Sequence, residues 1–190
     1  MTSCPAASLV PTSFLTFRLH GTIPAASRRE LQAALRQAQE AGTDSRRAQK
    51  QFFARFDAVL DRAPIGPRYF ENEKLAEGLA GEIMMLEETG FAVHGFAILP
   101  NHVHLVLHLP ESSPLSFAKA IDLLHLRTAA ACRRLLRPKL PPEAEFWQPG
   151  WFEYAVQDEA ELSRLLAYLR GNARQAGLAE RFQQWPYVNE

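Results

Sequence analysis

The sequence predicts an α+β fold in which helices cover one antiparallel sheet. The first observation is the mixed order of the expected elements: strand, helix, helix, two strands, helix, strand and helix. The second is a pair of apolar segments, residues 91–99 and 102–109, which flank Pro100-Asn101 and predict a β-hairpin. The third is size and composition, because 190 residues with 47% hydrophobic and 22% charged side chains suit a globular domain. We therefore expect residues 1–190 to form a single domain.

Local patterns before the hairpin predict one strand and a helical region. Residues 12–20 are rich in β-forming side chains and end at a glycine, which predicts the first strand. Residues 27–62 are rich in Ala, Gln, Arg and Leu, and we interpret them as two helices or as one helix interrupted near Gly42. A further helix is expected from about Glu71 to Glu88.

Capping patterns place the helices after the hairpin. Ser113 followed by Pro114 predicts an N-cap and a helix that runs to about Arg137. Residues 152–157 predict a short strand. Asp158 with an acid three residues later resembles a capping box, and it predicts a last helix that runs toward residue 177.

Charge and cysteine content exclude several classes of protein. Lys and Arg number 21 and Asp and Glu number 21, so a uniformly basic coat for nucleic acid is excluded. Two cysteines, Cys4 and Cys132, cannot form a disulfide framework and suit a reducing compartment. The first eleven residues lack the pattern of a signal peptide. Residues 89–110 carry no Asp, Glu, Lys or Arg, but their histidines, prolines and asparagine indicate two strands and no membrane span.

Charge is segregated in the second half of the chain. Residues 119–139 contain six basic residues and one acid, whereas residues 143–161 contain six acids and no base. Two interpretations stay open. The segments form two solvated faces of opposite sign, or the basic helix forms one wall of a phosphate-binding groove.

Two pairs of side chains are candidates for chemistry. His102 and His104 are two apart in a predicted strand, so their imidazoles leave the same face of the sheet and could chelate one divalent ion. Tyr168 and Asn172 are four apart on the rim of the apolar stripe of the last helix, from which a tyrosine could reach a cleft. The alternatives are surface histidines on a half-polar strand and ordinary packing of a tyrosine.

Four runs of sequence resemble one known family. The run HGFAILPNHVHLVLHLP resembles the signature of the REP-associated tyrosine transposases, which belong to the single-tyrosine HUH nucleases, where HUH means His-apolar-His. The run FLTFRLHG resembles the first strand of the family, and FWQPGWFEYAVQDEAEL is similar to its FWQ segment. The run AYLRGNARQAGLAERFQQWPY resembles its tyrosine helix with the Trp-Pro pair that follows. The resemblance covers nearly the whole chain.

This resemblance implies a fold, a mechanism and partners. The fold would be the HUH nuclease fold, with a ferredoxin-like antiparallel sheet. By motif position, His102, His104 and Asn172 would be metal ligands, and Tyr168 would be the nucleophile that forms a covalent 5′-phosphotyrosine. The open ligand set suits Mg²⁺ or Mn²⁺. The partner would be single-stranded or hairpin DNA, and no membrane is expected. The protein would act in the bacterial cytoplasm, at the nucleoid, as a monomer or homodimer.

Some positions depart from the family pattern and keep alternatives open. Ala173 replaces the usual proline, His125 replaces a common lysine, and Leu99 and Glu153 replace a methionine and an aspartate. The first alternative is therefore a catalytically silent protein that binds DNA hairpins. The second is an unrelated metallohydrolase, for which Glu153 is the one carboxylate base that the sequence suggests near the metal.

Basic and aromatic residues are the candidates for DNA contacts. Trp147 and Trp151 could stack on unpaired bases or could be buried against the sheet. Because neutral imidazoles bind metals, we predict that activity falls below about pH 6. The candidates for contacts with the DNA backbone are Arg18, Arg127, Arg133 and Arg134.

Overall fold

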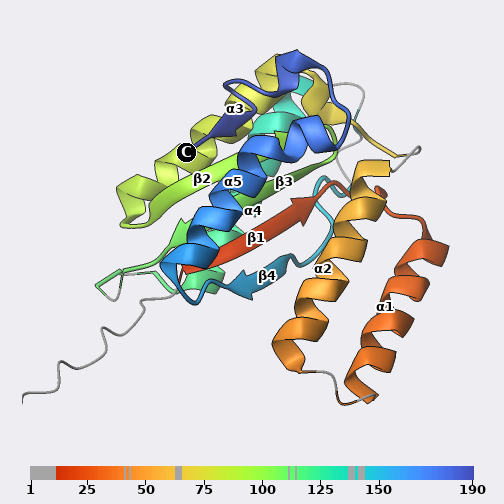
Figure 1. The fold of residues 1–190 in the computed structure, drawn as a ribbon. Helices are drawn as coiled ribbons and strands as arrows, with labels where there is room; N and C mark the ends of the chain where they lie inside the picture. The colour runs from red at the N-terminus through yellow and green to blue at the C-terminus, as the bar shows by residue number, and fades with distance from the viewer. Residues whose placement is uncertain are drawn as a thin grey trace, which may run out of the picture.

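One antiparallel sheet organises the protein (Figure 1). The computed structural model describes residues 12–40, 42, 44–62, 66–110, 112–113, 115–136, 140 and 144–190. Predictions for Cys4, Pro114 and Arg137 lie outside this set. The strands follow the order β4-β1-β3-β2-β5 in the sheet. Their bounds are β1 (Thr12–Arg18), β2 (Ala92–Leu99), β3 (His102–His108), β4 (Phe152–Ala155) and β5 (Val188–Asn189).

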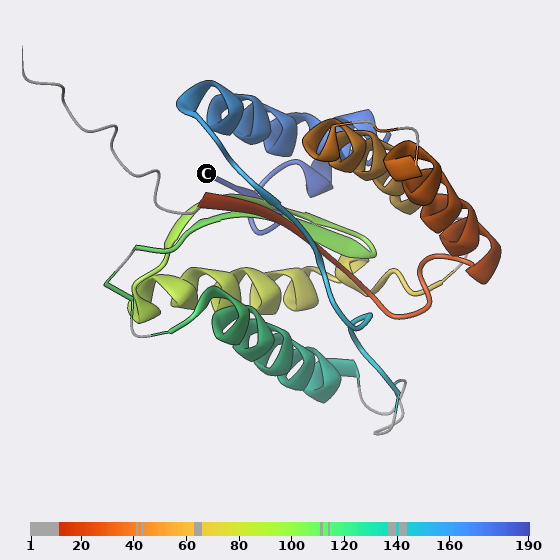
Figure 2. The same cartoon turned by 90° about the horizontal axis from the view of Figure 1, so that it is seen from below.

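Helices cover both faces of the sheet (Figure 2). One face packs on α3 (Glu73–Met84) and α4 (Phe117–Leu136), and the other packs on α2 (Ser45–Arg62) and α5 (Glu159–Gln175). The helix α1 (Ala25–Glu40) packs on α2. Three short 3₁₀ helices complete the described part: Tyr69–Glu71, Met85–Thr89 and Glu180–Phe182. The predicted α+β fold is confirmed.

The predicted hairpin is confirmed, and it presents different side chains to the two faces of the sheet. In the register of β2 and β3, Leu99 pairs with His102 and Ala97 pairs with His104. Val103, Leu105 and Leu107 pack into the core beneath α3 and α4, so the two histidines face α2 and α5. Among the described residues, no helix is long and apolar enough to cross a membrane.

The predicted N-cap of α5 is confirmed, and the predicted N-cap of α4 is wrong. Asp158 caps α5, because its carboxylate accepts a hydrogen bond from the Glu161 N–H at 2.7 Å. The predicted cap at Ser113 is wrong, since α4 begins at Phe117 and the Ser116 hydroxyl accepts from the N–H three residues later at 3.4 Å. The Ser113 hydroxyl instead accepts from the N–H of Leu115 at 3.3 Å, so it closes a local turn before the helix.

Candidate active site

His102 and His104 lie side by side on β3 with their Nε2 atoms 3.2 Å apart. Both side chains are buried. The Asn101 side chain donates its Nδ2 to the Leu60 carbonyl at 3.2 Å, which turns its Oδ1 toward His102 Nδ1 at 2.6 Å. Because an amide oxygen only accepts, we assign the His102 proton to Nδ1, which leaves a lone pair on Nε2. His104 Nδ1 lies 2.8 Å from the Thr16 hydroxyl, which can either donate or accept.

A carboxylate from α2 joins the histidine pair. Asp57 Oδ1 lies 3.0 Å from His104 Nε2 and 3.9 Å from His102 Nε2. This oxygen is buried, and among the described residues it has no hydrogen-bond partner. The three side chains form a group that could hold a metal ion, because their ligand atoms all lie within 4.8 Å of one another.

The sequence analysis missed Asp57 and named the wrong carboxylate. Glu153 lies on β4, is exposed, and accepts hydrogen bonds from the Ser13 hydroxyl at 3.0 Å and Trp151 Nε1 at 3.2 Å. The signal for Asp57 was its place on an apolar stripe, four residues after Phe53 and three before Leu60. A carboxylate on the buried face of a helix requires a partner, and the helix alone does not tell which one.

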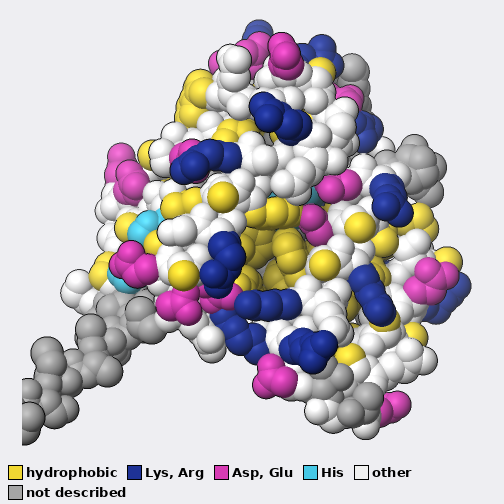
Figure 3. All heavy atoms as spheres, viewed as in Figure 1, with side chains coloured by type: hydrophobic (Ala, Val, Ile, Leu, Met, Phe, Trp, Pro, Cys, Tyr) yellow, Lys and Arg dark blue, Asp and Glu magenta, His cyan; other side chains and the backbone are white. Residues whose placement is uncertain are grey.

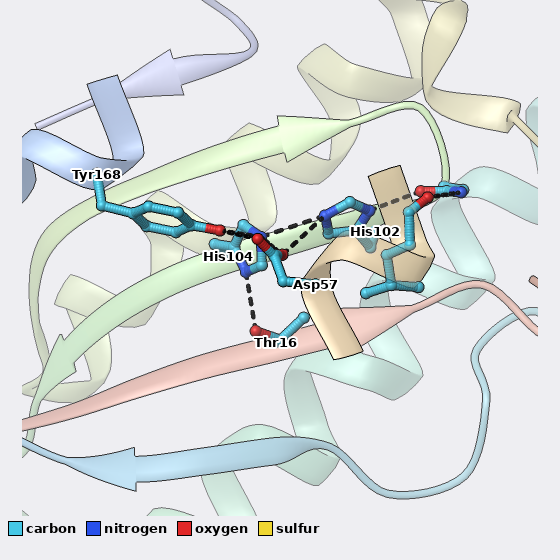
Figure 4. A network of polar contacts seen from close by, with 7 residues as sticks. Thr16, Asp57, His102, His104 and Tyr168 are labelled. Atoms are coloured by element: carbon cyan, nitrogen blue, oxygen red, sulfur yellow. Dashed lines mark hydrogen bonds and ion pairs between the residues drawn. The ribbon is translucent and has the colours of Figure 1, made fainter. Parts of the chain in front are cut away.

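The phenol of Tyr168 reaches the group from α5 (Figure 4). Its hydroxyl donates a hydrogen bond to Asp57 Oδ2 at 2.5 Å and lies 3.4 Å from His104 Nε2. The ring packs edge-on against Phe14 and Phe53, with centroids 6.1 and 6.0 Å away. The packing therefore holds a phenolic oxygen next to the histidine pair.

Burial and the nearby charges shift the pKa values of the group. Burial, and then the neighbouring His104, hold the pKa of His102 well below 6.5, so this imidazole is neutral. Burial raises the pKa of Asp57, but His104 and the Tyr168 hydroxyl outweigh it, and the pKa of the carboxyl ends below its ordinary value. Burial and then the Asp57 charge raise the pKa of Tyr168 far above 10, so the phenol keeps its proton.

Asn172, the predicted third ligand, is buried one helical turn after Tyr168. Its side-chain amide lowers the pKa of the Tyr168 phenol, although burial and Asp57 raise that pKa by more. Among the described residues, its Oδ1 has no hydrogen-bond partner. The role of Asn172 as a ligand stays a prediction.

Arg18 lies on the same face of the sheet as the histidine pair. It is directly opposite His102 in the register of β1 and β3, and side chains opposite each other share a face. Its Nη1 is buried and donates no hydrogen bond within the described part of the chain. Burial, followed by the charge of Arg28, lowers the pKa of Arg18 to about 10.

The other three candidate arginines lie on α4, which covers the opposite face of the sheet (Figure 2). Arg127 Nε lies 3.3 Å from a carboxylate oxygen of Glu82, and Arg133 donates to the Ala144 carbonyl. Arg134 is exposed. The fold therefore does not bring these three side chains to the histidine pair, and their contacts with DNA stay predictions.

The two tryptophans differ in their surroundings. Trp147 is buried and donates its Nε1 to the Thr128 hydroxyl at 2.8 Å, so burial against the sheet is correct for this residue. Trp151 is half-buried and lines a cavity of about 240 Å³. Other side chains that line this cavity are Thr16, Arg18, Phe52, Phe56 and Phe152.

Known proteins resemble this chain in sequence and in fold. No protein-family model matches the chain. A curated protein of Haemophilus influenzae, named "Putative REP-associated tyrosine transposase", is 29% identical over 108 residues, which are 53% of this chain. The chain spans 60% of the length of that relative.

A solved structure shares the fold. It is described as the REP-associated tyrosine transposase bound to a REP hairpin, and it matches with a TM-score of 0.52 at 16% identity. The match covers 99% of this chain and 82% of the other. The sequence match and the shared fold together confirm the resemblance of this chain to the REP-associated tyrosine transposases.

Proposed function

We propose that this protein is a metal-dependent endonuclease and strand transferase that cuts single-stranded DNA at hairpin-forming repeats through Tyr168. The observation that carries the proposal is the position of the Tyr168 hydroxyl, 3.4 Å from His104 Nε2 and beside a group that could hold a metal ion. The solved protein of similar fold is bound to a REP hairpin, which supports hairpin DNA as the partner.

The donor atoms suit a divalent cation. Ligand atoms at about 2.0–2.1 Å from an octahedral ion lie about 3 Å apart when they are adjacent. The two Nε2 atoms are 3.2 Å apart, and the buried Asp57 Oδ1, which lacks a hydrogen-bond partner among the described residues, is 3.0 Å from one of them. His102 and His104 would therefore hold the ion, with side-chain oxygens beside them. Mg²⁺ or Mn²⁺ bound there would neutralise a phosphate oxygen and polarise the phosphorus.

The protein side chains would carry out the strand transfer. The packed ring holds Tyr168 Oη for in-line attack on phosphorus, and a bond between that oxygen and the 5′-phosphate forms as the bond to the 3′ oxygen breaks. The phenolic proton would pass to Asp57 Oδ2, its hydrogen-bond acceptor at 2.5 Å, and the 3′ oxygen would leave as a hydroxyl after taking a proton from water. One ester bond replaces another, so rejoining needs no nucleoside triphosphate.

A covalent adduct tests the proposal. A 3′-labelled single-stranded hairpin DNA with flanking sequence, incubated with protein and Mn²⁺, should give a labelled band at the mass of protein plus DNA on a denaturing gel. Tyr168→Phe should lower the yield of this band by roughly a thousandfold or more, because the nucleophile is gone. Tyr154→Phe is the matched control and should keep the band. Cleavage that survives in Tyr168→Phe would refute the proposal and favour a metallohydrolase, for which Asp57 is a carboxylate next to the metal group.

A second candidate function is hairpin binding without cleavage. The favouring observation is the resting state of Tyr168, whose hydroxyl is bound to Asp57 and whose pKa is raised by burial and by that charge. In this case the same DNA should bind in a gel-shift experiment, and the covalent band should be missing with wild type in Mn²⁺.

A further inference from the structure

We propose that Asp57 of α2 is a direct ligand of the divalent cation, and that the site is therefore built from β3 together with a helix that none of the family motifs includes. The inference rests on the proposed function for the presence of a cation. It deepens that function by assigning a ligand that the sequence motifs did not contain.

The environment of Asp57 Oδ1 suits a bound cation. A buried carboxylate oxygen without a hydrogen-bond partner costs free energy through desolvation, and a cation bound to it would offset that cost. Among the described residues Oδ1 has no such partner, although it lies 3.0 Å from His104 Nε2 and 3.9 Å from His102 Nε2. With the His104 proton on Nδ1 and donated to the Thr16 hydroxyl, a cation between the three atoms would satisfy this oxygen and both Nε2 lone pairs at once.

The contacts that support His102 and Asp57 leave their metal-facing atoms free. The His102 proton is held at Nδ1 by Asn101 Oδ1, on the side of the ring away from Nε2. Asp57 Oδ2 is engaged by the Tyr168 hydroxyl, which fixes the carboxylate with Oδ1 turned to the imidazoles. Contacts that orient ligands in this manner are typical of the surroundings of metal sites.

The chemistry of the donor set also suits a divalent cation. Two imidazole nitrogens and one carboxylate oxygen bind divalent transition metals and leave positions open for phosphate oxygens. Cys132 is the one cysteine in the described residues, and it is buried on α4, across the sheet from the histidine pair. The set is therefore unlike the Cys-rich closed sites of structural zinc.

Mn²⁺ binding to the metal-free full-length protein, without DNA, tests the proposal. Titration calorimetry and Mn²⁺ electron paramagnetic resonance should give one site in wild type. Asp57→Asn, which keeps the shape of the side chain, should weaken Mn²⁺ by about tenfold or more, because a charged ligand is lost. Glu153→Gln, the matched carboxylate control, should change the affinity by less than about threefold. Equal affinity in wild type and Asp57→Asn would overturn the proposal.

One further variant separates ligation from a structural effect, and the titrations themselves separate it from the proposed function. Asp57→Cys should prefer Cd²⁺ over Mn²⁺, a reversal of metal preference that damage to the fold would not cause. If this variant binds both ions as weakly as Asp57→Asn, Asp57 is not a ligand. Because the titrations measure Mn²⁺ binding without DNA and without cleavage, a failure of the nuclease proposal leaves the ligand assignment standing. Melting in EDTA checks that each variant folds.

Discussion

Burial lowers the pKa values of His102 and His125. It holds the pKa of His102 well below 6.5, so this imidazole stays neutral to a lower pH than the sequence analysis assumed. The predicted loss of activity below about pH 6 therefore does not follow from His102. His125 is also affected, since it lies between the rings of Phe17, Trp147 and Trp151, and burial lowers its pKa to about 4.

The stability of the protein should depend on pH through His125. Its pKa is about 4 in the folded protein and about 6.5 when unfolded, so the unfolded chain takes up the proton first as the pH falls. The contribution of the neutral His125 to the free energy of unfolding should thus be lost as the pH falls from 6.5 to 4. Urea unfolding should show that wild type loses about 2 kcal/mol more than His125→Leu between pH 7 and 4.5. Parallel pH profiles of the two proteins would contradict this account.

Residues of the site differ in how far sequence could predict them. His102 and His104 follow from the period of a strand, and Tyr168 follows from a helix rim together with the family resemblance. Asp57, by contrast, lies on another element, α2, and 45 residues before His102 in sequence. Its place in the site depends on how α2 docks on the sheet, which is a tertiary contact without a local signal.

Aromatic contacts dock α2 on the sheet. Phe53 stacks on Phe152 of β4 with a centroid distance of 5.0 Å, and it also contacts the rings of His104 and Tyr168. Phe52 and Phe56 stack on the same ring of β4 at 6.1 and 6.3 Å. Near its start, α2 is also tied to α5 through ion pairs of Arg46 and Lys50 with Glu161. Asp57 reaches the histidines because these contacts fix the helix.

Removal of one aromatic ring should therefore loosen α2 and weaken metal binding together. Phe53→Ala should cost about 2 kcal/mol of unfolding free energy, less than a fully buried phenylalanine, because its ring is partly exposed. Amide hydrogen exchange should increase along α2, and Mn²⁺ should bind more weakly. Phe117→Ala on α4 is the control on the opposite face. Unchanged exchange in α2 and unchanged Mn²⁺ affinity in Phe53→Ala would contradict the docking role of Phe53.

Element boundaries show where sequence patterns succeed and fail. Asp158 starts α5 as predicted, because its carboxylate accepts the hydrogen bond of the Glu161 N–H in the first turn. Ser113 is not a helix cap, because its hydroxyl accepts a hydrogen bond from the N–H two residues later and so closes a turn. A serine followed by a proline can occur in either setting, so the pattern alone does not distinguish a turn from a helix start. The break near Gly42 does separate two helices, and this glycine has a positive φ of 69°, which other residues rarely adopt.

The two faces of the whole molecule have different surfaces. Figure 3 shows an apolar hollow between α5 and α2, on the face of the histidine pair, with Lys and Arg side chains along its lower edge and Asp or Glu side chains at its upper right. A cavity of about 200 Å³ lies there, and its lining includes Lys50, Phe53, Phe152, Glu161 and Arg164. The aromatic and basic side chains of this lining suit unpaired nucleobases and their phosphates. This face, rather than the basic side of α4, is where the fold places the site.

DNA binding should therefore depend on Arg18, which among the four candidate arginines is the one on the face of the site. Arg18→Ala should weaken binding of a hairpin with single-stranded flanks and reduce the salt slope by about one, because one phosphate contact is lost. Arg134→Ala, on α4, should change neither quantity. Fluorescence anisotropy across a series of salt concentrations measures both. A larger effect of Arg134→Ala would restore α4 as the wall of the phosphate groove.

The sequence predicted the fold class, but it did not predict which helices cover which face of the sheet. The hairpin, the strand alternation and the helix periodicity are local sequence signals. They predicted an α+β fold with one antiparallel sheet, which the structure confirms. Which helix covers which face follows from long-range packing, so the sequence analysis grouped the α4 arginines with the site although the sheet separates them. Net charge gave no guidance, because equal numbers of acids and bases conceal how they are distributed.

Mass spectrometry of the protein after reaction with Mn²⁺ and flanked hairpin DNA tests the central claim most directly. After nuclease and trypsin digestion, the peptide of residues 165–170 contains a single tyrosine, Tyr168, and should gain the mass of a 5′-linked nucleotide remnant. DNA that is cut while this peptide keeps its unmodified mass, or a remnant found on another tyrosine, would contradict the account.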